Sequence, residues 1–548
     1  MTTSSNRLAA KTVGELVRDG AARWPDSEVL VFDEWRISYA DAEKKSAVLA
    51  RKLLAAGVGK GAHVGLLFPN SPAYLISLLA IGRIGAVAVP VSTFSSVAEL
   101  QQLFAHADVC ALIAAEGFLA HNYIAKLEEA FPAIVQGSPF AIERAPFLRH
   151  IWIWSESPPP WALSALGDDA ALPEALLAAA EALVCPADTA AIIYTSGSTG
   201  EPKGVIHSQG NLLRQSINQA EDGDYRCGDR IFTGMPFFWV GGLTYKLLPA
   251  MQSGACILGT ANGAADALLD FIEKEKVSLF LGWPYSAKAL AAAADFEHRD
   301  LSAMRGGNLY PALAPELRPP DPSLVITGLG MTETAGPHTC GQRRWVEPEL
   351  RGSVGWVAPG MEHRIVNPET LETSADGDLG ELWVRGDTLM KGLYKRNPAE
   401  VFTVDGWYRT SDLVIRRKGH LFFEGRLDDM VKIKGVNIAP REIEAELLQM
   451  DGVVHAAVTG CKVGTDGDKV LAAVVYSSAF TDNNGAPLDD AQTVQVQSFL
   501  RERLSTYKVP SLFRLLPVHA IPLRSSGKID RLAMLQTLEQ AVLQGEIT

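Results

Sequence analysis

The segment 191–204, AIIYTSGSTGEPKG, combines the residue types that a phosphate-binding loop needs. An apolar strand, expected over 190–194, runs into a loop of serine, threonine and glycine that leads to Lys203. Glycine lets backbone N–H groups approach phosphate oxygens closely, hydroxyls add donors, and a lysine adds positive charge. The loop is not a Walker A sequence, because Pro202 precedes the lysine and Gly204 follows it. The full string predicts a nucleoside-triphosphate site, whereas a fragment such as SGSTG alone would indicate only a flexible turn.

Five further segments carry residues with catalytic chemistry. In chain order they are GMTET (330–334), GELWVRG (380–386), GWYRTSDL (406–413), GRLDDMVKIKG (425–435) and SSGKIDR (525–531). Taken alone, Glu333 and Lys528 would be solvated surface charges, and Asp412 a helix cap or Asx turn. The six segments in this order resemble the adenylate-forming superfamily, which includes acyl-CoA synthetases, luciferases and peptide-synthetase adenylation domains.

This resemblance implies a reaction in two steps. A carboxylate attacks the α-phosphorus of ATP, giving an acyl-adenylate and pyrophosphate, and a second nucleophile then displaces AMP. Because both reactants of the first step are anions, cations and preorganised dipoles must supply most of the catalysis. The implied catalytic residues are Glu333, which would hold Mg²⁺, Thr332 and Thr195, which would donate hydroxyl hydrogen bonds to phosphate, and Lys528, which would bridge the acid and the α-phosphate.

The resemblance also implies how the nucleotide is held. Asp412 would accept the two ribose hydroxyls. Arg426 would also contact the ribose, or form a structural salt bridge at the domain junction, or both. The implied nucleotide-binding set is Thr195, Ser196, Gly197, Ser198, Thr199, Gly200, Lys203, Gly307, Asn308, Gly328, Leu329, Gly330, Met331, Thr332, Asp412, Arg426 and Lys528. Leu329 departs from the family, which commonly has an aromatic residue there to pack on adenine. A branched alkyl group can cover the ring but does not stack on it.

The acid is expected to bind near PFFWVGG (236–242), where Trp239 stands in place of a histidine common in acyl-CoA synthetases. Its ring could wall or gate the acyl pocket, or belong to a core aromatic cluster. The implied pocket set is Phe238, Trp239, Gly241, Gly242, Gly307 and Gly330. Amino-acid-activating members place an aspartate in this stretch, and its absence disfavours an amino-acid substrate. The apolar lining favours a fatty, alicyclic or aromatic monocarboxylic acid.

The acceptor implied by the resemblance is coenzyme A. Gly435 would allow the pantetheine arm to approach, Lys432 would lie near the site during thioester formation, and Asp428 would be the hinge of a domain rotation. A fatty acyl-AMP ligase that passes the adenylate to a carrier protein, an oxygenating luciferase and a catalytically silent nucleotide-binding homologue stay open. A kinase-type P-loop enzyme is disfavoured by Pro202.

The elements that must position these residues alternate in type along the chain. Strands are expected over 62–70, 86–91, 277–284 and 323–330, and a helix over 71–84. Such alternation indicates an α/β fold of mainly parallel sheets flanked by helices, with ligands beyond the carboxyl ends of the strands.

From residue 426 the pattern becomes that of a small α+β domain. Its expected helices span 440–450 and 494–504. The sequence therefore predicts a large adenylation domain over 1–425 and a small mobile lid domain over 426–548.

Composition excludes several classes of protein. The chain has 548 residues, with 50 Lys plus Arg against 63 Asp plus Glu, and the net charge of −13 argues against nucleic acid as a partner. The 6 scattered cysteines predict unpaired thiols, and no secretory signal or membrane span is expected. We expect a cytoplasmic enzyme whose partners are ATP, coenzyme A and a small carboxylic acid. Whether it forms a homodimer is left open.

Overall fold

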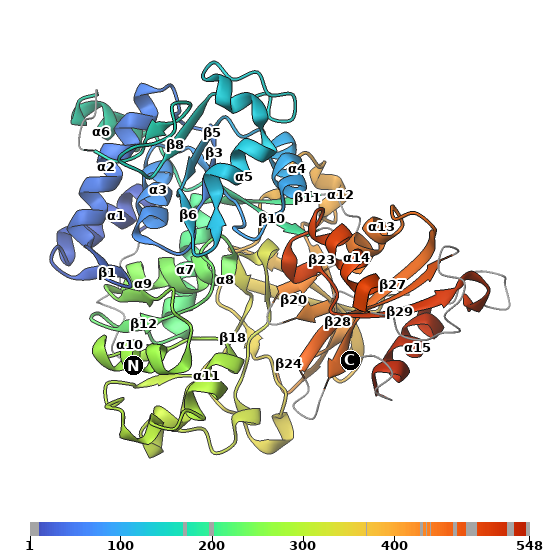
Figure 1. The fold of residues 1–548 in the computed structure, drawn as a ribbon. Helices are drawn as coiled ribbons and strands as arrows, with labels where there is room; N and C mark the ends of the chain where they lie inside the picture. The colour runs from blue at the N-terminus through green and yellow to red at the C-terminus, as the bar shows by residue number, and fades with distance from the viewer. Residues whose placement is uncertain are drawn as a thin grey trace. The chain divides into compact units, whose positions relative to one another are not determined.

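A computed structural model describes residues 10–167, 172–196, 202–368, 370–427, 431–433, 436–438, 440–463, 468–477, 490–522 and 531–543 (Figure 1). The chain forms two compact units. The first comprises 1–93, 107–194 and 204–427, and the second comprises 94–106, 195–203 and 428–548.

Two mainly parallel sheets form the framework of the first unit. The six-stranded sheet has the order β15 (Gly306–Gly307), β14 (Leu279–Phe280), β12 (Arg230–Phe232), β13 (Cys256–Gly259), β1 (Glu28–Phe32) and β2 (Trp35–Ser38). The eight-stranded sheet has the order β22 (Gly392–Leu393), β11 (Pro202–Ser208), β10 (Thr189–Ser196), β4 (Val87–Pro90), β3 (His63–Leu67), β5 (Ala111–Ala114), β8 (His150–Ile153) and β9 (Leu163–Ser164). Parallel pairing dominates both sheets, which confirms the predicted α/β class.

Helix α3 (Pro72–Arg83) joins the two sheets through one core. Ser71 caps its first turn by accepting from the Tyr74 N–H, and all of its residues are buried. It contacts β1 and β2 of one sheet and β3 and β4 of the other. A helix that is apolar on every side is stable only inside a protein, so its composition places it between layers.

The other helices of the first unit are α1 (Val13–Arg23), α2 (Tyr39–Ala55), α5 (Tyr123–Ala130), α6 (Glu174–Ala182), α7 (Gln209–Asp222), α8 (Val240–Gly242), α9 (Leu248–Ser253), α10 (Ala265–Lys274), α11 (Pro284–Ala291) and α12 (Pro398–Val401). Helices α1, α2 and α3 pack side by side, whereas α10 and α11 pack in a separate apolar cluster (Figure 1).

A third sheet of the first unit is antiparallel. It has the order β20 (Met361–Val366), β21 (Leu379–Gly386), β23 (Tyr408–Arg417) and β24 (His420–Arg426). Short two-stranded ladders pair β6 (Gly117–Phe118) with β7 (His121–Asn122), β16 (Gly330–Met331) with β17 (Gly336–Pro337), and β18 (Thr339–Cys340) with β19 (Trp356–Val357).

The second unit is built on the sheet β27 (Val453–Val463), β28 (Asp468–Ser477) and β29 (Leu512–Pro517). Its other elements are α4 (Val97–Ala107), the β25 (Val431–Ile433) and β26 (Val436–Ile438) hairpin, α13 (Pro440–Leu447), α14 (Asp490–Arg501) and α15 (Arg531–Leu543). Alternate residues of β28 face two cores: Ala473 and Val475 pack with α13 and α14, whereas Ala472 and Val474 pack with α15. This two-residue period is what a strand covered on both faces requires.

A buried ion triad ties α4 into the second unit. Lys508 Nζ lies 2.8 Å from a Glu99 carboxylate oxygen and 2.9 Å from one of Glu442. The two carboxylates hold the pKa of Lys508 above its ordinary value despite its burial. The ammonium is therefore charged at any physiological pH, and it neutralises one of the two acids that it contacts.

Two sequence expectations need adjustment. The strand expected over 323–330 is wrong, because Pro322–Leu324 form a 3-10 turn, Val325 makes an isolated bridge to Trp345, and Gly328 has φ of 75°. The second C-terminal helix begins at Asp490 and ends at Arg501, rather than spanning 494–504.

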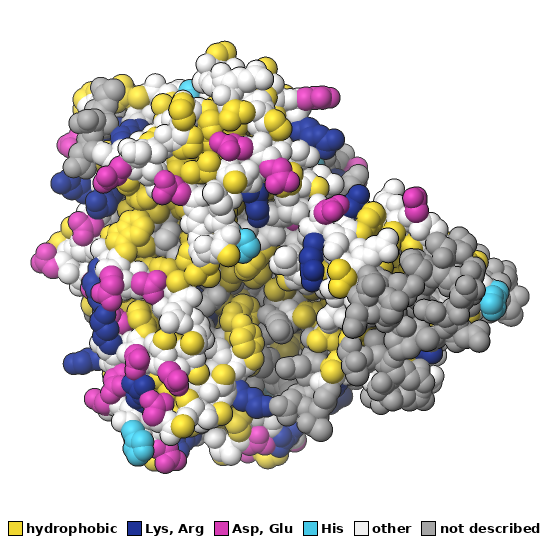
Figure 2. All heavy atoms as spheres, viewed as in Figure 1, with side chains coloured by type: hydrophobic (Ala, Val, Ile, Leu, Met, Phe, Trp, Pro, Cys, Tyr) yellow, Lys and Arg dark blue, Asp and Glu magenta, His cyan; other side chains and the backbone are white. Residues whose placement is uncertain are grey.

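Two observations bear on the expectations about membranes and nucleic acid. No helix in the described part of the chain is long and apolar enough to cross a membrane. On the face drawn in Figure 2, lysine and arginine side chains are interspersed with aspartate and glutamate and form no basic patch.

Arg83 provides a test of how the first unit is held together. Its buried guanidinium lies 2.8 Å from a Glu43 carboxylate oxygen, donates to Ser46 Oγ at 3.0 Å and pairs with Glu181, so it links α2, α3 and α6. We expect Arg83→Met to destabilise the unit by about 3 kcal/mol, because it leaves buried acceptors without their cation. Arg18→Met, which removes the half-exposed second partner of Glu181, should cost under about 1 kcal/mol. Melting temperature and urea midpoint measure both, and equal losses would contradict this assignment.

Candidate active site

The strand end at β14 and β15 provides a glycine-lined surface. Gly307 has φ of 112°, and a Cβ there would lie 2.0 Å from the Phe280 carbonyl oxygen, so only glycine fits. The next residue, Asn308, donates from Nδ2 to the Gly282 carbonyl at 2.7 Å. Its Oδ1 is buried and has no hydrogen-bond partner among the described residues. The arrangement leaves one buried acceptor beside the glycine pair.

Glu333 lies in a tight loop between β16 and β17. It belongs to the 3-10 turn Thr332–Thr334, and Ala335 closes that turn in the left-handed region with φ of 56°. The Glu333 side chain is nearly buried, and the Tyr408 hydroxyl donates to its Oε1 at 3.1 Å. A non-glycine residue in this backbone region is strained, and such strain clusters at functional sites. The fold therefore holds one carboxylate in a fixed position.

A polar face of helix α7 binds the backbone around that loop. Its side chains recur at i, i+4, i+7 and i+11, and all are largely buried. Asn211 donates to the Leu389 carbonyl at 3.0 Å, Gln215 to Pro337 at 2.6 Å and Asn218 to Pro359 at 3.0 Å. Asp222 accepts the backbone N–H groups of residues 341 and 342 at 2.7 and 3.1 Å. One helix thus fixes several irregular segments.

His207 lies under the same loop. Burial lowers the pKa of His207 to about 4, although the nearby Glu333 carboxylate opposes that shift. One of its ring nitrogens, Nδ1, lies 3.0 Å from Asn211 Nδ2. The imidazole is therefore neutral at physiological pH and adds no positive charge beside Glu333.

Asp412 lies on β23 next to a stretch where the strand pairing is irregular. The register of β21 and β23 shifts between residues 381 and 383, and Ser411 adopts φ of 61°. Asp412 is 4% exposed, its N–H donates to Thr410 Oγ1 at 3.0 Å, and its Oδ1 lies 3.6 Å from Arg426 Nε. Since Asp412 and Arg426 are cross-strand partners on β23 and β24, the sheet itself brings the predicted pair together.

The buried carboxylate of Glu381 stabilises the irregular backbone of β23 next to Asp412. Its Oε2 accepts from Arg409 Nη2 at 2.8 Å and from Trp383 Nε1 at 2.9 Å, and its Oε1 accepts the Ser411 N–H at 3.3 Å. These bonds fix the backbone on either side of Asp412. Glu381 lies within the GELWVRG segment, but the sequence analysis assigned it no role.

The segment predicted to bind the acid is anchored at its start by Asn70 and Tyr74. Asn70 donates to the Met235 carbonyl at 2.8 Å and accepts the Phe237 N–H at 2.7 Å, and the Tyr74 hydroxyl donates to the Phe237 carbonyl at 2.8 Å. These bonds set where the following aromatic residues begin.

Within that segment, the ring of Trp239 is half-buried and meets the buried Phe238 ring edge-to-face at 5.2 Å. Gly242 lies so near the Pro236 carbonyl that a Cβ would clash. The pocket glycine Gly330 approaches Pro337 in the same manner, and Gly241 has more room.

The other predicted residues fall into three groups. Leu329 is half-buried and packs against the apolar cluster of β20, β21 and β23, and its N–H donates to Thr339 Oγ1 at 2.7 Å. Thr195 and Lys203, near the ends of β10 and β11, are half-buried, and Lys432 on β25 is exposed. Gly197–Gly200, Asp428, Gly435 and Lys528 lie outside the described residues.

Sequence reasoning missed several residues that the structure makes important. They are the polar residues of α7, Asn70, Tyr74, Glu381 and Tyr408. The spacing of amides along 211–222 was a usable signal, because a second polar stripe on an amphipathic helix indicates a buried polar contact. The contacts of Tyr74 and Tyr408 join residues distant in sequence and left no such pattern.

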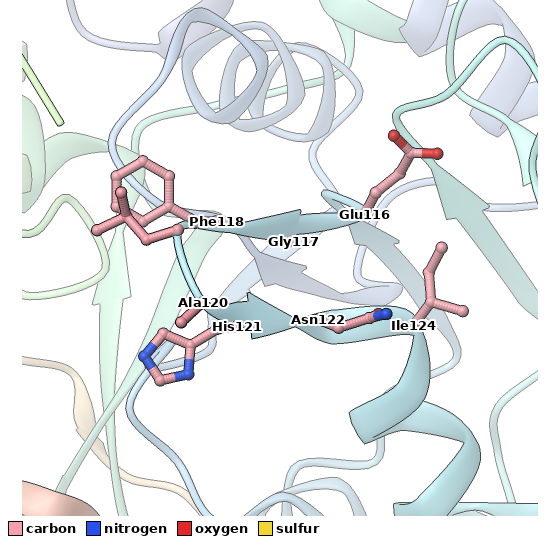
Figure 3. A pocket seen from close by; sticks show the side chains of 8 residues that line it. Glu116, Gly117, Phe118, Ala120, His121, Asn122 and Ile124 are labelled. Atoms are coloured by element: carbon pink, nitrogen blue, oxygen red, sulfur yellow. The ribbon is translucent and has the colours of Figure 1, made fainter.

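An open hollow of about 540 Å³ lies on the β6–β7 hairpin and is lined by residues 116–122 and Ile124 (Figure 3). None of the residues predicted for catalysis or binding lines it. Within the described ranges, no group of three or more His, Cys, Asp or Glu side chains could hold a metal ion unaided.

Comparison with known proteins identifies the family. Residues 17–394 match the AMP-binding enzyme family and residues 442–528 match the AMP-binding enzyme C-terminal domain. The chain is 30% identical to the indoleacetate–CoA ligase of Aromatoleum aromaticum, over 92% of this chain and 94% of the relative. It is 27% identical to the mitochondrial medium-chain acyl-CoA ligase of Mus musculus, over 98% and 89%.

Solved structures with a similar fold belong to related enzymes. The amide bond synthetase McbA from Marinactinospora thermotolerans superposes with a TM-score of 0.76 at 22% identity, covering 96% of this chain and 99% of that one. Together with the two family matches, which cover most of the sequence, these similarities show that the chain belongs to the AMP-binding enzyme family, as an ATP-dependent, AMP-forming acyl-CoA synthetase.

Proposed function

We propose that this synthetase activates a hydrophobic carboxylic acid, fatty, alicyclic or aromatic, to an acyl-adenylate and transfers the acyl group to coenzyme A. One observation carries the nucleotide half of the proposal. Strand β23 holds Tyr408, which binds Glu333, and four residues later Asp412, which pairs with Arg426. One strand thus carries the carboxylate assigned to the ribose and the tyrosine that binds the carboxylate assigned to the metal–phosphate complex.

In this assignment Asp412 accepts the ribose hydroxyls, and its ion pair with Arg426 helps to orient it. Thr195, Ser196, Gly197, Ser198, Thr199, Gly200 and Lys203 surround the phosphates, and Gly307, Asn308, Gly328, Leu329, Gly330 and Met331 surround the adenosine. The unpartnered Oδ1 of Asn308 is suited to an amino-group donor on the base.

Glu333 and Thr332 would hold Mg²⁺. A single nearly buried carboxylate, without a cluster of further ligands in the described ranges, suits an ion that takes most of its oxygens from substrate phosphates. When bound, the ion neutralises phosphate charge. The neutral His207 beside it brings no positive charge that would compete with the ion.

For the second step we propose a lid, residues 426–548, that turns about Asp428. Lys528 would serve adenylation, and the face carrying Lys432 and Gly435 would then serve thioester formation. This division between 1–425 and 426–548 rests on the resemblance and on the family match of the C-terminal domain.

The choice of acid rests on the lining. Phe238, Trp239 and the glycines at 241, 242, 307 and 330 offer apolar surface and space, and no carboxylate in 236–242 could bind an ammonium group. The relatives named above act on acids as different as an indole acetate and medium-chain acyl groups, so the family alone does not select one.

One assay separates this function from transfer to a carrier protein and from catalytic silence. The protein is incubated with ATP, Mg²⁺, coenzyme A and a panel of acids, and AMP, pyrophosphate, ADP and thioester are measured. Acid-dependent AMP, pyrophosphate and thioester support the proposal. Pyrophosphate with no thioester indicates a different acceptor, and no acid-dependent turnover indicates a silent binder.

Lys528→Ala should slow adenylation by about 10²–10³-fold, because a single charge-stabilising group is typically worth that much. Thioester formation from preformed acyl-adenylate should remain largely intact. Lys462→Ala, at an exposed lysine of β27, is the matched control and should change neither step. Rapid-quench measurement of the two half-reactions tests this, and equal loss in both would contradict the assigned role.

Glu381→Gln should raise the KM for ATP by about 10-fold while kcat changes little, because the mutation weakens the charge-assisted bonds that support Asp412. Glu362→Gln removes an exposed ion pair with Arg385 on the neighbouring strand and should leave both parameters unchanged. A loss confined to melting temperature, with normal kinetics in the folded enzyme, would make Glu381 purely structural.

Trp239→Ala should shift the preferred acid toward longer or bulkier chains with the KM for ATP unchanged, because truncating the ring opens volume. The control is Trp35→Ala, at a 41% exposed tryptophan that packs on Trp154. Relative kcat/KM across an acid series measures the shift. An unchanged series in a folded variant would place Trp239 in the core instead.

A further inference from the structure

Lys246 is a buried cation without an acidic partner. It lies on the π-helical turn Leu243–Leu247 and is 4% exposed. Its Nζ lies 3.7 Å from the centroid of the Tyr245 ring, and no carboxylate within the described ranges is in ion-pairing distance. Burial lowers the pKa of Lys246 to about 7, and the charge of Arg343 adds to this effect. A lysine in an apolar interior normally pairs with an acid. Among the residues that the structure describes, no such ion pair accounts for the burial of Lys246.

Arg343 supplies a second cation at the same place. Its backbone lies in the left-handed region with φ of 64°, and a Cβ on Gly306 would overlap its guanidinium. Its Nη1 donates to the Gly223 carbonyl, and no ion pair forms with it among the residues described. Three acids act on Arg343 electrostatically: Asp224 and Asp229 are both paired with Arg305, and Asp222 accepts the N–H groups of residues 341 and 342. Burial lowers the pKa of Arg343 as well.

Both cations are attached to the elements assigned to the acyl pocket. Lys246 follows Gly242 by four residues, which places the two on one side of a helix. The Arg343 guanidinium fills the space beside Gly306, which directly precedes the pocket residue Gly307. π-Helical turns are uncommon, and they occur frequently at functional sites.

We propose that Lys246 and Arg343 form an anion-binding subsite at the inner end of the acyl pocket, and that the acid carries a second anionic group, a carboxylate or sulfonate, across an apolar body from the reacting carboxylate. The proposal rests on the acyl pocket assigned above. A ligand anion would supply an acidic partner for the buried Lys246 and the half-buried Arg343, and it would favour the charged form of the lysine. An acid that lacks it would leave them unpaired, which is the strongest basis for discrimination between substrates.

The test uses acids in matched pairs: hexanoate with adipate, octanoate with suberate, and phenylacetate with 4-carboxyphenylacetate, together with an ω-sulfo acid of adipate's length. Acid-dependent pyrophosphate release gives kcat/KM for each. We expect the second anionic group to raise kcat/KM by about 10-fold or more in at least one pair, and Lys246→Met to abolish that preference. The sulfo acid distinguishes a carboxylate subsite from a sulfonate subsite.

Two variants control for the substitution itself. Arg344→Met alters the exposed neighbour of Arg343 and should retain the preference. Lys246→Met should also raise the melting temperature without ligand, since it removes an unpaired buried charge. A fall would indicate a packing role for the lysine. If Lys246→Met fails to fold, Lys246→Gln, which keeps the length but removes the charge, replaces it.

Binding is measured separately by calorimetry, with each acid and no ATP. Tighter binding of dianionic acids that Lys246→Met abolishes supports the subsite even if no thioester forms, and only the proposed ligase reaction would then fail. Turnover or binding of monoacids at least equal to that of their dianionic partners overturns the subsite and leaves the ligase proposal standing.

Discussion

Side chains of helix α7 hold the backbone of the segments that surround the Glu333 loop, and the rest of the candidate site depends on these hydrogen bonds. The segments around residues 337, 341, 359 and 389 have irregular backbone, and buried peptide groups must find hydrogen-bond partners that a sheet would otherwise provide. The amides of α7 supply three of them, and Asp222 accepts two N–H groups. Burial raises the pKa of Asp222, whereas those two N–H groups and the charges of Arg344 and Arg343 favour its charged form. A helix with an ordinary apolar face would pack as well but could not hold these loops.

The two catalytic candidates on this framework share a structural solution. Each follows or precedes a non-glycine residue with positive φ: Ala335 for Glu333 and Ser411 for Asp412. Left-handed backbone at such residues costs free energy, and the surrounding bonds over-determine it. At Ala335 the stabilising bond comes from the Thr244 hydroxyl, which donates to the Ala335 carbonyl. At Ser411 it comes from Glu381, whose carboxylate accepts the Ser411 N–H. The strained backbone, held by these hydrogen bonds, thus fixes the positions of the two carboxylates.

How much the sequence reveals depends on whether a contact is local. Helix α3 and the strands on either side of it were predictable, because apolar periodicity and the Ser71–Pro72 start are local signals. The resemblance implied a ribose contact for Asp412 and for Arg426, but their pairing with each other comes from a cross-strand register that appears only in the folded sheet. The strand expected over 323–330 failed because the segment forms one 3-10 turn, one isolated bridge and irregular backbone through Gly328, which an apolar run alone does not distinguish from a buried strand. Glu381 and Lys246 were missed because their importance comes from burial, which the sequence does not display.

The triad of Glu99, Lys508 and Glu442 has a consequence for biosynthesis. Glu99 leaves the ribosome 409 residues before the lysine that neutralises it. At typical translation rates of about 5–20 residues per second, the α4 segment waits roughly 20 to 80 s for its partner. During that interval its carboxylate stays hydrated and the apolar face of α4 has no cover from the second unit. Vectorial synthesis therefore leaves the second unit incomplete until the segment that carries Lys508 has emerged.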